Sequence, residues 1–263
     1  MLWEMLMVEP GRALIKPSYM SVFLQLFFDD TELASGTGFL ANSPSKRLFL
    51  LTARHNLTGR DQSTGQPLSS HGGVPNMVRV WHCPLGMDRA WISRDEMLHD
   101  GDGNPRWVEH PAFGADADVV GLPLENLQGT FYSLYMLQEP RARIHAGVAE
   151  PVSVVGFPFG LKVGGSQPVW ATGFIASEFY IDFDNKPQFL IDCRARQGQS
   201  GSPVILYRHS GTFTEEVRMG GGIAMAGAPV WRLLGLYSGR LNRESDLGIV
   251  WRLDAIRDLI AKY

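Results

Sequence analysis

Apolar residues in this chain gather in short runs, and turn-forming residues separate one run from the next. Ser21–Phe28, with the sequence Ser-Val-Phe-Leu-Gln-Leu-Phe-Phe, is one such run. Runs of four to eight residues that are rich in β-branched and aromatic side chains are typical of β-strands. The pattern therefore predicts an all-β protein built from many short strands.

Five such runs precede residue 118, and the stretches between them carry turn residues. The predicted strands are Ser21–Phe28, Phe39–Leu40, Leu48–Leu51, Met77–His82 and Ala90–Ser93. The stretch 59–76 is rich in Gly, Ser, Gln and Pro without periodicity, so we expect a surface loop there. The stretch 94–117 is polar and rich in glycine, and the next strand is predicted to begin near Asp118.

The second half repeats the pattern after a mixed stretch, 128–144, that we expect to carry a linker. Its six predicted strands are Pro151–Gly156, Val169–Ser177, Phe189–Asp192, Pro203–Tyr207, Leu233–Ser238 and Gly248–Trp251. The segment 207–229 is expected to be a long insertion, with a flexible hinge at Gly220–Gly222. Asp254 is predicted to N-cap a last helix, in which Ile256, Leu259 and Ile260 share one apolar face.

Composition narrows the class of protein. The chain has 263 residues, of which 44% are hydrophobic and 19% charged, as in ordinary globular domains. A net charge of -3 gives no electrostatic case for nucleic acid or an anionic membrane as partner. No run reaches the ~18 apolar residues of a membrane helix, and two glutamates interrupt the apolar N-terminus, which makes it a poor signal peptide. Only two cysteines occur, Cys83 and Cys193, and we expect free thiols and a cytoplasmic location.

A serine between glycines is the first candidate for chemistry. In Gly198-Gln199-Ser200-Gly201 the glycines permit a tight turn, and an apolar run follows at Val204. The backbone N–H groups of Gly198 and Ser200 could hold a developing oxyanion. An ordinary Gly/Ser/Pro turn would look similar, so this stretch alone does not decide.

Two further stretches supply partners for such a serine. His55 follows an apolar run at the point where a loop is expected to begin, and Asp118 heads a β-rich segment. A hydroxyl becomes a nucleophile when a base removes its proton, and that base needs an acceptor to fix its tautomer. Asp116 and Ser202 are rivals, but Asp116 is expected in a solvated loop, and Ser202 lacks the preceding glycine pair. The six other histidines follow no comparable strand.

The order His, Asp, Ser and the local motifs together resemble the trypsin-like serine peptidases. Thr52-Ala53-Arg54-His55 is similar to their T-A-x-H motif, and Asp118 and Ser200 lie in similar strand and loop contexts. Gly36-Thr37-Gly38-Phe39 resembles the G-[ST]-G-F turn, and Gly156–Gly160 resembles a segment of bacterial HtrA-like and glutamyl-endopeptidase-like members. The similarity runs from about residue 21 to the end of the chain.

This resemblance implies two six-stranded antiparallel β-barrels with a C-terminal helix. The implied division is an N-terminal extension over 1–20, a first barrel over 21–127, a linker over 128–150 and a second barrel over 151–263. The implied function is a serine endopeptidase that hydrolyses peptide bonds through an acyl-enzyme, without cofactor or metal. His55, Asp118 and Ser200 would be catalytic, with Gly198 and Ser200 forming the oxyanion hole.

Substrate specificity is harder to predict. By resemblance the pocket walls include Arg194, Gln197, Ser238, Gly239 and Arg240. The two arginines could favour an acidic residue before the scissile bond, but they could equally point to solvent. In zymogen-activated members an aspartate before the nucleophile pairs with a freed N-terminal ammonium. Here that position is the neutral Gln199, so we expect no such activation.

A catalytically silent scaffold that binds proteins is the alternative function. The presence of all three candidate residues argues against it. No G-x-S-x-G elbow, zinc motif, P-loop or dinucleotide fingerprint occurs in the sequence. No PDZ-like segment follows the predicted helix, so HtrA-style assembly is not expected. The expected partner is a protein or peptide substrate, and any regulatory partner is unknown.

Overall fold

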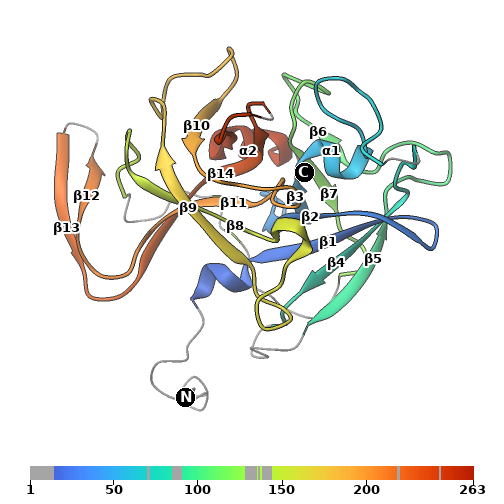
Figure 1. The fold of residues 1–263 in the computed structure, drawn as a ribbon, viewed down its shortest axis with the longest axis horizontal. Coiled ribbons are helices and arrows are strands. Elements are labelled where there is room, and N and C mark those ends of the chain that lie inside the picture. Colours follow the sequence, from blue (N-terminus) through green and yellow to red (C-terminus); the bar gives the residue numbers. More distant parts are fainter. Residues whose placement is uncertain are drawn as a thin grey trace.

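A computed structural model describes residues 15–69, 72–84, 91–127, 135, 137, 144–217, 220–242 and 244–263. It contains mainly strands, which form one seven-stranded sheet, one closed barrel and a two-stranded hairpin (Figure 1). The strands of the first half are β1 (Ser21–Phe28), β2 (Thr31–Asn42), β3 (Leu48–Thr52), β4 (Met77–His82), β5 (Ile92–Met97), β6 (Val108–Glu109) and β7 (Val120–Pro123). Those of the second half are β8 (Pro151–Gly156), β9 (Val169–Ile175), β10 (Gln188–Asp192), β11 (Pro203–Arg208), β12 (Gly211–Val217), β13 (Gly220–Ala226), β14 (Val230–Arg240) and β15 (Leu247–Arg252). The helical elements are η1 (Lys16–Tyr19), α1 (Arg54–Thr58), η2 (Pro158–Gly160) and α2 (Leu253–Ile260).

The prediction of an all-β protein with a C-terminal helix is confirmed. The bounds of β1, β4 and β8 coincide with those predicted from the apolar runs. In β4 the burial alternates residue by residue, because one face lies on the core and the other faces outward. Seven of the eight residues of β1, by contrast, are at least partly buried, which matches its nearly continuous apolar run.

The first half differs from the six-stranded barrel that the resemblance implies. Its strands form an antiparallel sheet in the order β5-β4-β1-β2-β3-β7-β6. No pairing between described residues joins the outer strands β5 and β6, so the sheet is curled but open. Its strand β6 has only two residues and pairs with β7 alone.

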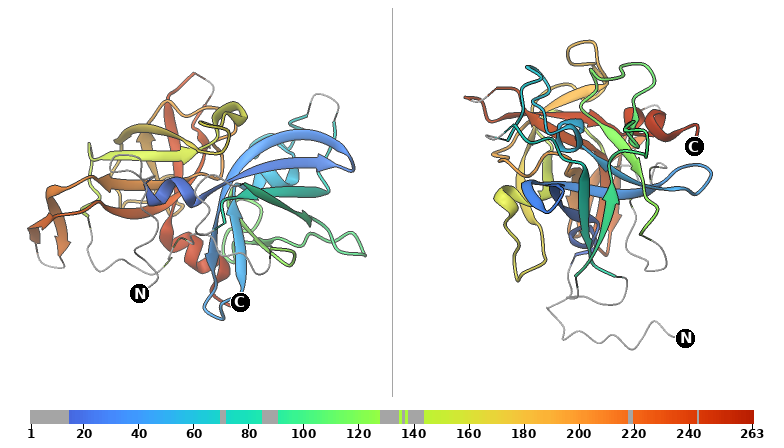
Figure 2. Two further views of the ribbon diagram at one scale, coloured as in Figure 1. Left: turned by 90° about the horizontal axis from the view of Figure 1, so that it is seen from below. Right: turned by 90° about the vertical axis from the view of Figure 1, so that its right-hand side faces the viewer.

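The second half is a closed barrel with the strand order β10-β15-β14-β11-β8-β9. Its longest strand, β14, pairs with β11 on one side and β15 on the other. Figure 2 shows the barrel and the curled sheet side by side, with α2 at their junction. The six predicted strands of this half correspond to the six strands of the barrel.

Two expectations in the polar stretches are wrong. The segment 94–97 continues β5, because Arg94–Met97 pairs with Met77–Val80 of β4. The glycine run at 220–222 is not a hinge but the start of β13, which pairs with β12. The hairpin β12–β13 projects from the barrel (Figure 1), and buried Phe213 anchors it in the barrel core.

Helix α2 joins the two halves. It contacts β14 and β15 of the barrel and β6 and β7 of the sheet. Ile256, Leu259 and Ile260 are buried in a cluster that also includes Phe49 of the sheet and Trp251 of the barrel. The predicted apolar face is therefore confirmed. The predicted N-cap is wrong, because Arg252 occupies that position and Asp254 lies in the first turn.

Some predictions fall partly outside the described residues. Most of the expected linker, 128–150, and most of the N-terminal extension, 1–20, belong to this group, so the proposed division of the chain stays a prediction. Cys83 and Cys193 are both buried. Among the described helices, none has the length and apolar character needed to cross a membrane.

Candidate active site

The pairing of β3 with β7 brings His55 and Asp118 together. Thr52 at the end of β3 lies opposite Val120 at the start of β7. His55 follows β3 by three residues and Asp118 precedes β7 by two, so both leave the sheet at the same edge. His55 does not begin a loop, as expected from sequence, but lies in the first turn of the short helix α1.

The Asp118 carboxylate binds both the backbone and the ring of His55. One oxygen accepts the His55 backbone N–H at 3.0 Å, and the other lies 2.8 Å from Nδ1. A carboxylate can only accept, so Nδ1 carries the proton, and in the neutral ring Nε2 keeps its lone pair. Burial lowers the pKa of His55, but the charge and hydrogen bond of Asp118, with a smaller effect of Asp61, raise it overall above 6.5.

Ser238 completes the surroundings of Asp118. Its hydroxyl donates to the same carboxylate oxygen that faces the imidazole, at a distance of 2.5 Å. Sequence reasoning placed Ser238 in the substrate pocket and did not foresee this bond. Ser238 belongs to β14 of the barrel, and Asp118 precedes β7 of the first sheet by two residues, so this bond joins the two halves. The two residues are 120 positions apart in the sequence.

Ser200 lies in a turn that precedes β11 and is held by β14. The Gly201 N–H donates to Tyr237 O at 2.8 Å, and the Tyr237 N–H donates to Ser202 O at 2.9 Å. These bonds place Ser200 next to the strand that carries Ser238. Ser200 is partly exposed, whereas Ser202 is fully buried, which distinguishes the two candidate serines.

Glycine is required at both ends of this turn. Gly198 and Gly201 have φ angles of 90° and 89°, a region that other residues rarely adopt. A Cβ on Gly201 would lie 2.0 Å from Thr37 O, and one on Gly198 would lie 2.5 Å from Phe157 O. The glycine pattern seen in the sequence therefore has a steric cause in the structure.

The backbone N–H groups of Gly198 and Ser200 in this turn point away from the protein's own hydrogen-bond acceptors. Gln197 O accepts the Phe159 N–H at 2.7 Å, and Gln199 O accepts the Ser202 N–H at 2.9 Å. In a trans peptide the N–H points opposite to the carbonyl, so the Gly198 and Ser200 N–H groups point away from these contacts. Neither N–H group has a hydrogen-bond acceptor among the described residues.

The structure brings Ser200 to His55 through the backbone. Asn56, the residue after His55, donates from Nδ2 to Ser200 O at 2.9 Å. Within the described part of the chain, no hydrogen bond joins the Ser200 hydroxyl to the imidazole. Such bonds are often long in an unliganded site and shorten when substrate binds. Asp116, the rival to Asp118, is exposed.

The residues predicted to bind substrate lie near the turn but differ in their surroundings. The Arg194 side chain is 85% exposed, and its Nε lies 3.8 Å from Asp246. Arg240 is exposed and Gly239 partly exposed at the end of β14, while Gln197 is exposed beside Gly198. The structure therefore gives Arg194 an acidic partner of its own at the surface.

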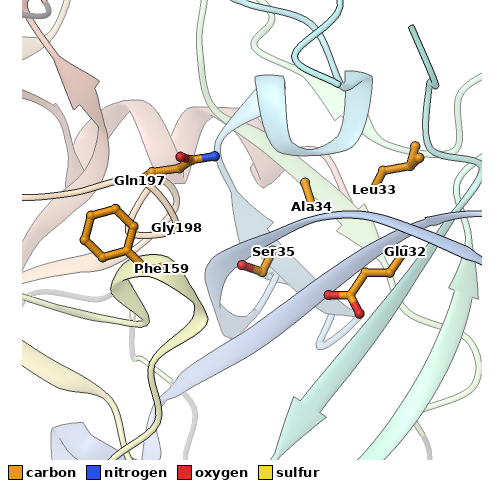
Figure 3. Close-up of a pocket in the computed structure, with 7 residues that line it drawn as sticks. All are labelled: Glu32, Leu33, Ala34, Ser35, Phe159, Gln197 and Gly198. Atoms are coloured by element: carbon orange, nitrogen blue, oxygen red, sulfur yellow. The ribbon is translucent and has the colours of Figure 1, made fainter. Parts of the chain in front are cut away.

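A depression of about 560 Å³ adjoins the turn (Figure 3). Gln197 and Gly198 form one side, Phe159 of η2 another, and residues 32–35 of β2 the third. Phe159 is 64% exposed, and its backbone φ of 53° is left-handed. Sequence reasoning missed this depression, because β2, η2 and the turn meet only in the folded chain.

Within the described residues, no group of three or more His, Cys, Asp or Glu side chains could hold a metal ion.

Comparisons with known proteins agree with this architecture. No protein-family profile and no curated protein sequence matches the chain. Among solved structures, the thermostable serine protease AL20 from an extremophilic microorganism has 14% sequence identity and a TM-score of 0.52, covering 94% of this chain and 97% of that one. The Anisep protease from Arthrobacter nicotinovorans has 13% identity and a TM-score of 0.48, covering 90% and 92%. The Rv3671c protease from M. tuberculosis, in its active form, has 17% identity and a TM-score of 0.47, covering 94% and 81%.

The likeness to AL20 shows the fold. A closed barrel, a curled half-barrel sheet and a short C-terminal helix together make a chymotrypsin-like fold, as the sequence predicted. A fold does not define an activity, so the function is argued from the site.

Proposed function

We propose that the protein is a serine endopeptidase in which Ser200, His55 and Asp118 form the catalytic triad. The observation that carries this proposal is the set of bonds from His55 and Ser238 to Asp118, at 2.8 and 2.5 Å, beside the turn that holds Ser200. A buried carboxylate on Nδ1 is the arrangement that prepares an imidazole to act as a base. The Gly156–Gly160 segment gives the chain the motif style of HtrA-like and glutamyl-endopeptidase-like peptidases.

In the proposed reaction the Ser200 hydroxyl attacks the scissile carbonyl carbon, and its proton passes to His55 Nε2. The tetrahedral intermediate collapses when His55 returns that proton to the leaving amine, which leaves an acyl group on Ser200. Water then attacks this ester with the same proton transfers, releasing the acid and restoring the hydroxyl. Asp118 keeps the imidazole in one tautomer and stabilises its cation.

The oxyanion of each intermediate would be bound by the N–H groups of Gly198 and Ser200. Support comes from the orientation of their peptide groups, whose carbonyls are held by Phe159 and Ser202. Removing one donor from such a hole typically lowers turnover by about 10²–10³-fold. The glycine geometry of the turn therefore matters to the reaction nearly as much as the nucleophile.

An acidic preference at the residue before the scissile bond has little structural support. Arg194 is mostly exposed and faces Asp246, and Arg196 Nη1 lies 3.4 Å from the same carboxylate. A guanidinium that already has a carboxylate partner gains less from an acidic substrate. A peptide library with Asp or Glu dominating that position would contradict this interpretation.

The test of the proposed function is peptide hydrolysis by purified protein and two variants. Ser200→Ala and His55→Ala should each lower turnover by about 10³-fold or more, with the thermal unfolding midpoint nearly unchanged. Ser210→Ala and His209→Ala are matched controls, because both of these residues are exposed and lie outside the site. Wild-type turnover in Ser200→Ala would overturn the assignment of Ser200 as the nucleophile. No turnover in the wild-type protein would overturn the proposed function and favour a silent binding scaffold.

The proposed location is the cytoplasm, because two cysteines are too few for the disulfide framework that secreted proteins of this class usually carry. Cell fractionation with antibodies against the chain tests this point independently of activity. Recovery in a secreted fraction would contradict it.

A further inference from the structure

Four consecutive carbonyl oxygens in the turn of Ser200, those of residues 197 to 200, each accept a hydrogen bond. Two of the donors, the N–H groups of Phe159 and Ser202, belong to the same half of the chain. The other two carbonyls, Gly198 O and Ser200 O, are held by Thr37 and Asn56 from the first half. The turn thus depends on both halves of the molecule.

Thr37 holds the carbonyl of Gly198. Its hydroxyl accepts the Phe157 N–H at 3.0 Å, so its proton is free to be donated to Gly198 O at 2.7 Å. The Thr37 backbone N–H also donates to Ser200 O at 3.2 Å. Thr37 has no exposed surface, so water cannot replace these bonds.

Asn56 holds the carbonyl of Ser200 and belongs to the helix of His55. Its side-chain amide donates to Ser200 O at 2.9 Å and to Thr52 Oγ1 at 3.0 Å. Thr52 in turn donates to Thr37 O at 2.7 Å. Donor and acceptor roles are therefore fixed along the whole chain of bonds from α1 to the turn.

Glycines make room for both side chains. A Cβ on Gly36 would lie 2.8 Å from Asn56 Nδ2, and a Cβ on Gly156 would lie 2.9 Å from Thr37 Oγ1. A side chain at either position would push the donor away from the turn. The local backbone is thus shaped around these two donors.

We propose that Thr37 and Asn56 are positioning residues that hold the turn of Ser200 in its reactive conformation, an inference that rests on the proposed peptidase function. They fix the peptide groups 198–199 and 200–201. These alternate along the chain with the peptide groups 197–198 and 199–200, whose N–H groups would bind the oxyanion. Because Asn56 follows His55 directly, the same contact sets the nucleophile relative to the base.

We expect the loss of these hydrogen bonds to lower turnover more than it lowers the stability of the fold. One hydrogen bond contributes about 1 kcal/mol net to stability, whereas a misplacement of about 1 Å in a reacting group can lower the rate about 10²-fold. Loss of the Thr37 hydroxyl should therefore lower kcat by about 10–100-fold and leave KM within about threefold. The acid limb of the pH profile should not move, because the bonds of Asp118 to His55 and Ser238 are untouched.

The experiment compares Thr37→Val, which keeps the shape but loses the hydroxyl, with Thr37→Ser, which keeps the hydroxyl. Recovery of kcat in Thr37→Ser to within about threefold of wild type supports the proposal. Wild-type kcat in Thr37→Val, or equal losses in both variants, would overturn it. If Thr37→Val does not fold, Asn56→Leu takes its place, because Asn56 is only partly buried and its loss leaves the Thr37 N–H on Ser200 O.

A second readout does not depend on peptidase activity. Amide hydrogen exchange of the peptide spanning 197–203 should become about tenfold faster in Thr37→Val and Asn56→Leu than in Thr37→Ser. This result is expected even if the wild-type protein hydrolyses no peptide, so failure of the proposed function is distinguishable from failure of the positioning role. Unchanged exchange in both variants would overturn the positioning role.

Discussion

Asp118 accepts three hydrogen bonds, from the backbone N–H of His55, from its Nδ1 atom and from the Ser238 hydroxyl. Together they fix the position and the tautomer of the imidazole. The same carboxylate outweighs the effect of burial, so the net pKa of His55 is above its usual 6.5.

This upward shift predicts the pH dependence of the reaction. His55 must be neutral to act as a base, so kcat/KM should rise with pH through a midpoint above 6.5. Asp118→Asn removes the charge and leaves the burial, so the midpoint should fall and turnover should drop by about 10³–10⁴-fold. The measurement is the pH profile of kcat/KM for both proteins, and an unchanged midpoint in Asp118→Asn would contradict the assignment.

The same shift affects stability with a defined sign. The folded pKa of His55 is raised, so its contribution is fully present below the unfolded pKa and is lost as pH rises through the folded value. The pH at which His55 loses its proton and could act as a base is therefore also the pH at which the fold loses this stabilisation.

A single methyl group at Gly201 is the sharpest steric test of the turn. Gly201→Ala places Cβ 2.0 Å from Thr37 O at a φ of 89°, so we expect it to lower the free energy of unfolding by about 3 kcal/mol or more. Gly103→Ala is the matched control, because Gly103 has a φ of 84° but nothing within 4 Å. Its cost should be about 1 kcal/mol. Equal costs in urea denaturation would show that the close approach to Thr37 is not important.

Among the loops of the structure, the one before Ser200 is bridged by Gln199, which forms two hydrogen bonds with Arg196. Its side-chain oxygen accepts the Arg196 N–H at 2.8 Å, and its backbone N–H donates to Arg196 O at 3.1 Å. Gln199 is only 1% exposed, and a buried ammonium facing a neutral amide would lack a counter-charge. Gln199 thus adds bonds within the loop to those that Thr37 and Asn56 supply from the first half. We therefore expect the loop to need no new N-terminus.

This arrangement predicts activity without N-terminal processing. The chain should hydrolyse peptides with its starting methionine intact, as verified by intact-mass spectrometry of the assayed sample. Ser200→Ala in the same form is the control for background activity. Activity that appears only after removal of residues up to about Tyr19 would contradict the prediction.

Elements with strong apolar patterns could be predicted from sequence, and polar ones could not. The bounds of β1, β4 and β8 follow from their apolar runs. Strand β5 was predicted only in part, over 90–93, because its polar half, 94–97, is stabilised by distant partners. Glu96, for example, is buried and accepts the N–H groups of Glu125 and Asn126 at 3.0 and 2.6 Å.

The candidate site, too, could be predicted from the sequence only in part. His55 and Asp118 were each singled out by local sequence context, and the structure places His55 Nδ1 2.8 Å from Asp118. The hydrogen bonds that Ser238, Asn56 and Thr37 donate join residues 120, 144 and 161 positions apart in the sequence. Local sequence patterns therefore do not predict them. Thr37 lies inside the G-T-G-F motif and Asn56 follows His55, which are the only local hints.

At the scale of the whole molecule, the candidate site lies where the two halves meet. His55 and Asp118 come from the curled sheet, and Ser200 and Ser238 come from the barrel side. Helix α2 and the shared apolar cluster hold the halves together, and a chain of hydrogen bonds from Asn56 and Thr37 crosses between them. We propose that the groups at this junction make the Ser200 hydroxyl nucleophilic.

Labelling with a fluorophosphonate probe, followed by mass spectrometry of the labelled peptide, tests that claim most directly. We expect one adduct on Ser200, absent in Ser200→Ala, formed much more slowly in His55→Ala and unchanged in the control Ser210→Ala. An unlabelled wild-type protein, or an adduct on another serine such as Ser202, would contradict it.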